Sequence, residues 1–207
     1  MSWEPFGFMF FSGIEAFSLY FLTMCLFRFR FQEHIAQAFI LTLLVNLQSY
    51  ILRNDFALGN FMPIITIFFF VLFFAIIVRM PLVFSVIATI SGYVIFGVVQ
   101  CLLALLLFGS LEEARATLAN GYVLQASTGI LIMALSWLGF RLGYGFTFDM
   151  NRLRFKFEDI MVVLLIAVFL VTVSIVLYFN ELSIVTLFFV ATSAYLLYYA
   201  MRKDRES

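Results

Sequence analysis

The sequence predicts an all-α integral membrane protein: a polytopic bundle of seven transmembrane helices, N-terminus outside and C-terminus inside. Of the 207 residues, 65% are hydrophobic, and the mean hydropathy is +1.11, which excludes an ordinary soluble domain. The apolar residues gather in segments close to the roughly 20 residues that a helix needs to cross hydrocarbon. These segments are 5–27, 35–51, 61–78, 82–108, 122–140, 160–179 and 182–201.

Helix is the predicted state of every segment, because an open sheet would leave backbone groups unpaired in lipid. The period-2 pattern of a membrane barrel is also absent. The first segment follows a start without basic residues that carries Glu4, so we expect it to be retained rather than cleaved as a signal peptide. The segments use nearly the whole chain, which predicts a single transmembrane domain over 1–207 and no soluble domain.

The distribution of basic residues predicts the orientation of the protein. It also indicates whether the second segment, which is short and partly polar, crosses the membrane. Alternating crossings put ten of the twelve basic residues on one side and leave Arg53 and Arg115 opposite. By the positive-inside rule, the side with ten is cytoplasmic. If 35–51 did not cross, the best arrangement would divide the basic residues eight to four, so seven crossings are preferred. We therefore expect a multi-pass protein of the cell membrane, in a bacterial plasma membrane.

The later segments are bounded by turn residues. A tight turn over 79–81 precedes the fourth segment, with Pro81 suited to the first turn of a helix. The polar pair 180–181 separates the last two segments, because one helix over 160–201 would be about twice the hydrocarbon thickness. Two small-residue pairs, Ala88 with Gly92 and Gly139 with Gly143, predict close helix packing within the bundle, with a dimer interface as the alternative.

Glu15 is the first candidate for a functional residue. It lies near the middle of the first segment, where a carboxylate costs on the order of 2.5–3.5 kcal/mol to insert. Ser12 and Ser18, three residues away on either side, share its helical face. Such a group is expected to face the bundle. It then serves as a ligand, ion or proton site or, with equal weight, as a neutral acid that holds two helices together.

Four amide side chains share the outer half of their segments on this topology, with Glu15 at the floor of the layer: Asn46, Gln48, Gln100 and Gln125. A shared depth predicts a ligand-binding cavity that opens to the exterior and is lined by these amides. The alternative is that each amide bonds one helix to another, at about 0.6 kcal/mol per contact.

Basic and aromatic residues alternate in two cytoplasmic stretches, 27–31 and 152–157. Aromatic rings can be buried at the interface while Arg and Lys reach phosphate groups, so these stretches predict contact with an anionic cytoplasmic leaflet, with a protein partner as the alternative. The net charge is zero, and no nucleic-acid partner is expected. Cys25 and Cys101 lie in different helices near opposite ends, which predicts no disulfide.

Little in the sequence predicts an enzyme. Cys25 and His34 supply the minimum pair for a thiol peptidase, but the membrane peptidases that process quorum peptides place His before Cys, and here the order is reversed. A single His without a cluster of ligands makes a zinc site improbable. No phosphate-cradling motif lies in a suitable context, so no cofactor is expected.

Two stretches, FFSGIEAFSLYFLTMCLFRFR at 10–30 and SVIATISGYVIFGVVQ at 85–100, resemble a known sensor type. They are similar in texture to the multi-helix N-terminal regions of Gram-positive quorum-sensing (GHKL) histidine kinases. The resemblance implies a signal-receiving helical bundle with a cytoplasmic exit. Because the sequence stops at Ser207 without a phosphoacceptor helix or an ATP-binding domain, we expect a free-standing or truncated sensor module without kinase activity.

The function expected from the sequence is therefore non-enzymatic. A membrane sensor or accessory module would bind a small apolar or peptide ligand in the outer-half cavity and signal to the cytoplasmic side. Its partner would be a membrane protein or kinase, and oligomers are compatible with this reading. The alternatives are a small proton-coupled transporter that uses Glu15 and, ranked below it, a membrane thiol peptidase.

Overall fold

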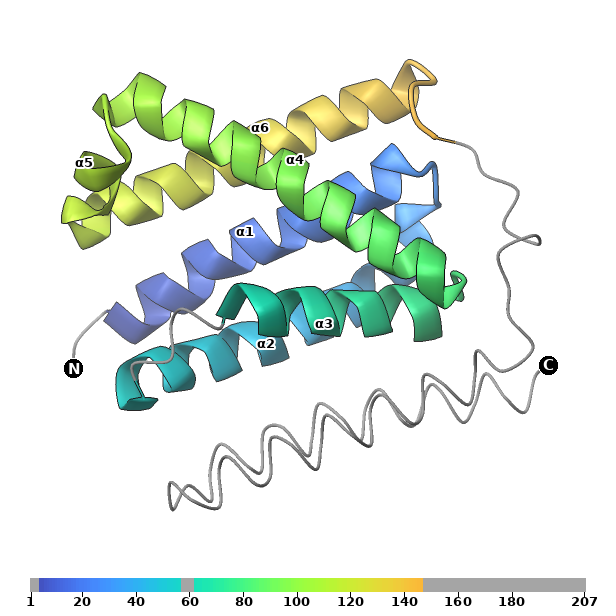
Figure 1. Ribbon diagram of the computed structural model, residues 1–207, viewed down its shortest axis with the longest axis horizontal. Helices are drawn as coiled ribbons and strands as arrows, with labels where there is room; N and C mark the ends of the chain where they lie inside the picture. The colour runs from blue at the N-terminus through green and yellow to red at the C-terminus, as the bar shows by residue number, and fades with distance from the viewer. Residues whose placement is uncertain (1–3, 57–61, 147–207) are drawn as a thin grey trace. The chain divides into compact units, whose positions relative to one another are not determined.

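The computed structural model describes residues 4–56 and 62–146, and no strand occurs among them. The predicted segments 160–179 and 182–201 lie outside the described residues. In chain order the elements are α1 (Glu4–Leu26), η1 (Phe31–His34), α2 (Ile35–Phe56), α3 (Met62–Ile76), α4 (Leu82–Phe108), α5 (Leu111–Ala116) and α6 (Leu118–Arg141) (Figure 1). The prediction of an all-α chain is confirmed for this part.

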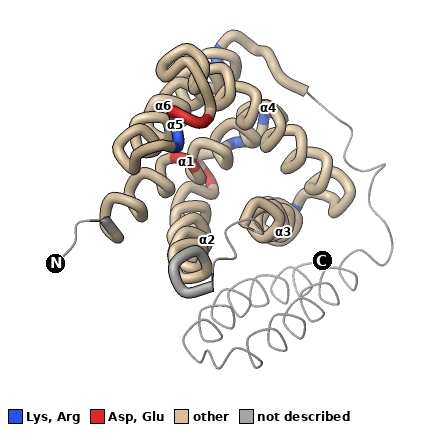
Figure 2. The backbone as a smooth tube through the Cα atoms, turned by 60° about the vertical axis from the view of Figure 1, so that its left-hand side comes forward, with Lys and Arg blue, Asp and Glu red and all other residues tan. Residues whose placement is uncertain are grey.

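Four of the described helices, α1, α2, α4 and α6, are long and apolar enough to cross a membrane. The fourth predicted segment has the bounds of α4, and the other predicted segments before residue 147 differ from their helices by a few residues at the ends. The helix α3 is apolar but has 15 residues. Charged residues are sparse along these helices (Figure 2). The chain is thus an all-helical protein whose long apolar helices are compatible with several membrane crossings.

Two compact units make up the chain, and each is described by itself. The first unit comprises Met1–Asn46 and Ala88–Phe148, and the second comprises Leu47–Ile87 and Asp149–Ser207. In the second unit, α3 has a continuous run of buried residues over 69–76, including an edge-to-face pair of Phe73 and Phe74. The helix ends at Ile76, Arg79 in the connection that follows has a φ of 64°, and the Pro81 carbonyl accepts hydrogen bonds from Ser85 in the first turn of α4. The predicted tight turn over 79–81 is confirmed.

In the first unit, α1 and α6 lie against each other and run in the same direction. Near one end, the Phe11 ring stacks on Tyr122 with centroids 4.8 Å apart. Further along both helices, a Cβ added to Gly129 would lie 2.7 Å from Ile14 Cγ2. Since the contacts follow the same order on both helices, the pair is parallel, and Gly129 permits its close approach.

The first-unit part of α4 runs antiparallel to α1, because Gly92 lies beside Thr23 and Gln100 lies beside Glu15. An added Cβ on Gly92 would meet the Thr23 hydroxyl, so the predicted packing role of this glycine within the bundle is confirmed. Gly139 and Gly143 make no close helix contact with the described residues, so their predicted packing role stays a prediction. A Cβ on Gly139 would meet nothing within 4 Å, and Gly143 lies in the turn after α6 with a φ of 87°.

Two short elements connect the long helices of the first unit, and neither is predicted from the sequence. The helix η1 lies beside α1, where the Tyr20 hydroxyl donates to the Phe31 carbonyl at 2.6 Å. From there α2 returns along α1 until Asn46 lies beside Gly13, which makes α2 antiparallel to α1. The helix α5 is capped by the Ser110 side chain, which accepts from the backbone N–H of Glu113.

Candidate functional site: a polar layer between α1, α4 and α6

Glu15 and Gln100 join α1 to α4 directly. Gln100 Nε2 donates a hydrogen bond to Glu15 Oε1 at 2.9 Å, and both residues are half-buried. The neighbouring Ser18 hydroxyl donates at 2.7 Å to the backbone carbonyl of Glu15 rather than to its carboxylate. The carboxylate of Glu15 on α1 therefore accepts a side-chain hydrogen bond from α4.

The other polar residues of the first unit lie at a similar level along α1. Asn46 is 5% exposed, and its Nδ2 lies 3.6 Å from the position of a Cβ on Gly13. Gln125 and Thr128 belong to the part of α6 that runs beside 7–14 of α1. At 1.5 Å per residue, these levels fall within about two helical turns of Glu15.

Three side-chain atoms of this layer are buried without a hydrogen-bond partner among the described residues: Asn46 Nδ2, Gln125 Oε1 and Thr128 Oγ1. One is a donor, one is an acceptor and the hydroxyl can act as either. Leaving such a group unsatisfied costs about 1–3 kcal/mol. The layer is therefore well suited to hold a group that donates and accepts hydrogen bonds.

The sequence-predicted residues do not all fall in this layer. Gln48 is buried, at 1% exposure, but it belongs to the second unit rather than to the first unit that contains this layer. Thr128 is fully buried in the layer and is absent from the sequence-predicted set. Its signal was its position three residues after Gln125, which puts both side chains on one face of a helix. The amide-lined cavity itself stays a prediction.

Cys25 and His34, the candidate peptidase pair, lie near the C-terminal end of α1. The Cys25 side chain is 2% exposed, and His34 lies in η1 and is half-buried. A thiol nucleophile must be reachable by its substrate, so the burial of Cys25 disfavours this chemistry. Within 4–56 and 62–146, no three His, Cys, Asp or Glu side chains gather as they would around a metal ion.

No protein-family model matches this chain, and neither the curated proteins nor the solved structures compared with it give a match.

Proposed function

We propose that the chain crosses a bacterial plasma membrane seven times, with its N-terminus outside and its C-terminus in the cytoplasm. Helix directions in the first unit support an even number of crossings between α1 and α4, because these two helices are antiparallel. The helix α2 is antiparallel to α1, with Asn46 beside Gly13, which supports a crossing by α2 in the return direction. The parallel pair also brings Arg28 and Arg141 to the same end, and the positive-inside rule makes that end cytoplasmic.

Within this topology, the first unit acts as a membrane sensor or accessory module. The hydrogen bond between Glu15 and Gln100 is the observation that carries the proposal, since it joins two helices through groups that a ligand can replace. A small apolar or peptide ligand with an amide or similar group would bond to Glu15 and to the unsatisfied atoms beside it. Exchange of the Gln100 bond for a ligand bond would free α4 to shift against α1, and the shift would reach the cytoplasmic loops.

The proposed module would have three interaction partners: a kinase or another membrane protein, the anionic cytoplasmic leaflet and a second copy of this chain. The resemblance to quorum-sensing kinase sensor regions points to a kinase or another membrane protein that receives the shift. The basic stretches 27–31 and 152–157 would contact the anionic cytoplasmic leaflet. Oligomerisation would bring the cytoplasmic loops of two copies together.

Side-specific labelling tests the topology. In a chain carrying Cys25→Ala and Cys101→Ala, a single cysteine at Tyr144 should react only with a reagent applied from the cytoplasm. A cysteine at Thr117 should react only from outside, because it lies at the other end of α6. Labelling of both positions from one side would overturn the topology and the depth of the proposed site.

Ligand retention tests the sensor. We expect wild-type protein purified in mild detergent to carry a small apolar molecule or peptide that mass spectrometry detects. Gln100→Ala and Gln125→Ala should each lower its occupancy about tenfold, as expected for one lost hydrogen bond to a buried group. The control is Gln32→Ala, because Gln32 is exposed in η1 away from the layer. Unchanged occupancy in both layer variants would contradict the proposal.

A proton-coupled carrier is the second candidate, and the position of Glu15 near the middle of α1 favours it. In that case Glu15 takes up and releases a proton during each cycle, and Gln100 is its partner in one state. Glu15→Gln would then abolish solute uptake driven by a pH gradient in proteoliposomes. Gradient-driven uptake that needs Glu15, in a protein that retains no ligand, would favour the carrier over the sensor.

A further inference from the structure

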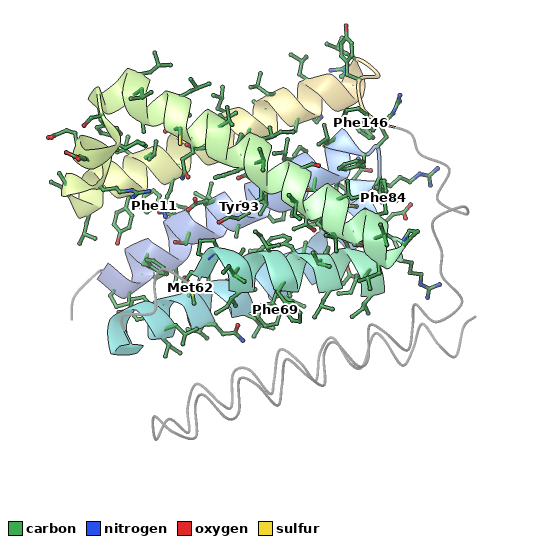
Figure 3. The ribbon with its side chains drawn as sticks, in the orientation of Figure 1. Phe11, Met62, Phe69, Phe84, Tyr93 and Phe146 are labelled. Carbon is green, nitrogen blue, oxygen red and sulfur yellow. The ribbon has the colours of Figure 1, made fainter. Side chains whose placement is uncertain are left out.

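The turn that follows α6 is bound to the end of α1. The backbone N–H of Phe146 donates to the Leu26 carbonyl at 2.8 Å, and Arg28 Nη1 donates to the Gly143 carbonyl at 2.8 Å. The rings of Phe27 and Phe146 lie 5.9 Å apart. Phe146 lies beside the end of α1 nearest the turn (Figure 3). These contacts fix the Arg28 side chain across the turn over 142–146.

The backbone of this region is adapted to that arrangement. Arg28 adopts a φ of 56°, in the left-handed region that favours glycine, at the position that closes α1. Gly145, with a φ of 147°, allows the turn to approach: an added Cβ would lie 2.6 Å from Arg28 Cγ and 3.0 Å from the Leu26 carbonyl oxygen. Because the backbone of Arg28 is strained and its side chain packs against Gly145, the Arg28 side chain is held in one position.

A second guanidinium belongs to the same turn. Arg141 ends α6 two residues before Gly143, and its Cζ lies 5.2 Å from the centre of the Trp137 ring. Both Arg28 and Arg141 are exposed, and no carboxylate among the described residues pairs with either of them. Arg28 uses one of its five N–H donors on Gly143, so most of its hydrogen-bonding capacity is available to a ligand.

We propose that Arg28, Arg141 and the turn over 142–146 form a binding site for the phosphate headgroup of an anionic phospholipid. Arg28 is bonded to the turn and Arg141 directly precedes it, and guanidinium groups bind phosphate oxygens in a forked geometry. The lipid source is indicated by the exposed apolar and aromatic side chains around the turn: Leu142 is 64% exposed, Phe146 is 55% exposed and Trp137 is 47% exposed. Such side chains contact the glycerol and upper acyl region of a bilayer, whereas a free anion needs none of them.

This site differs from general attraction to an anionic leaflet, and it does not depend on the ligand layer at Glu15. Arg30 provides the contrast, because its side chain is 82% exposed and forms a salt bridge to Glu33 at 3.3 Å. General attraction treats Arg28, Arg30 and Arg141 alike, since each contributes one charge near the membrane surface. In a specific headgroup site, lipid binding depends on Arg28 and Arg141 and does not depend on Arg30.

Native mass spectrometry of the full chain in mild detergent provides the test, with phosphatidylglycerol and phosphatidylcholine added in equal amounts. We expect wild type to retain phosphatidylglycerol preferentially, and Arg28→Gln and Arg141→Gln to lower that retention about tenfold each, the effect of one lost charge-assisted bond. Arg30→Gln should retain it as wild type does. If Arg28→Gln does not fold, Arg141→Gln decides, because this exposed side chain makes no hydrogen bond to the turn among the described residues.

A second pair of variants changes geometry without changing charge. Gly145→Ala should lower phosphatidylglycerol retention as strongly as Arg28→Gln, because the added methyl displaces the Arg28 side chain. Gly139→Ala is its control, since a Cβ there meets nothing within 4 Å. Equal losses in Arg28→Gln and Arg30→Gln, or full retention in Gly145→Ala, would overturn the site. Displacement of the lipid by glycerol phosphate at equal concentration would assign the turn to a free anion and also overturn the proposal.

Discussion

Within the first unit, the contacts of α1 with α6 and with α4 are built differently. Against α6 it packs in parallel through rings and a glycine, and the turn after α6 is bound to its end. Against α4 it packs antiparallel: Gly92 lies beside Thr23, and a hydrogen bond between the Glu15 and Gln100 side chains joins the two helices. At the α1–α6 contact the glycine lies against side chain and backbone, which fixes one arrangement, whereas the side chains at the α1–α4 contact can rotate and exchange hydrogen-bond partners. We infer from this contrast that the α1–α6 contact stabilises the fold, whereas the α1–α4 contact can rearrange.

The largest effect should come from a substitution that forces α1 and α6 apart. In Gly129→Val, the new side chain would meet both the side chain and the backbone of Ile14. Overpacking of this kind costs about 1–3 kcal/mol, and we expect the upper end because backbone cannot rotate away. Unfolding in mixed micelles measures the loss. Gly139→Val is the control, and equal losses in both variants would show that valine itself, not the contact, is responsible.

Breaking the polar connection between α1 and α4 should cost less. Glu15→Ala leaves the Gln100 amide without its acceptor, so the free energy of unfolding should fall by about 1–2 kcal/mol. Glu15→Gln keeps an acceptor oxygen and should stay within about 0.5 kcal/mol of wild type. The same micelle titration compares the two. Equal stability of the Ala and Gln variants would reduce the Glu15–Gln100 contact to packing.

Gly92→Ala, at the other α1–α4 contact, should have a smaller effect than Gly129→Val. The added methyl meets a side-chain hydroxyl of Thr23, which already bonds to the Leu19 carbonyl and can rotate at the expense of that bond. We expect a loss of about 1 kcal/mol, the net worth of one hydrogen bond. A loss as large as that of Gly129→Val would show that both contacts of α1 are equally rigid and would remove the contrast.

The smallest change in stability should come from Thr128→Val, although this variant bears directly on the ligand layer. Thr128 Oγ1 is buried without a partner among the described residues, so an isosteric methyl should leave stability unchanged or raise it by up to about 1 kcal/mol. Ligand occupancy should nevertheless fall. The control is Thr23→Val, which removes a hydroxyl that is bonded within its own helix. Destabilisation by Thr128→Val would indicate that the hydroxyl stabilises the fold itself.

Hydropathy predicted the long helices well, because crossing hydrocarbon demands a length that the sequence displays directly, as in 82–108. It missed α5, although Ser110 and Glu113 have the spacing of a helix cap, because a short polar helix contributes nothing to hydropathy. Nor could it predict which residue bonds to Glu15. The long helices are apolar on every side, so their sequences carry no periodic signal for the inward face, and depth alone cannot distinguish Gln100 from Gln125.

The sequence separation between contacting segments sets the time at which each contact of α1 can form during synthesis. Gln100 follows Glu15 by 85 residues, and the turn that binds Arg28 follows it by 115 residues. At about 5–20 residues per second, α1 waits on the order of ten seconds for either neighbour. During that interval α2, which is made first and brings Asn46 beside Gly13, is the neighbour available to α1. The adjustable contact with α4 therefore becomes available for assembly before the contact with α6 completes the pair.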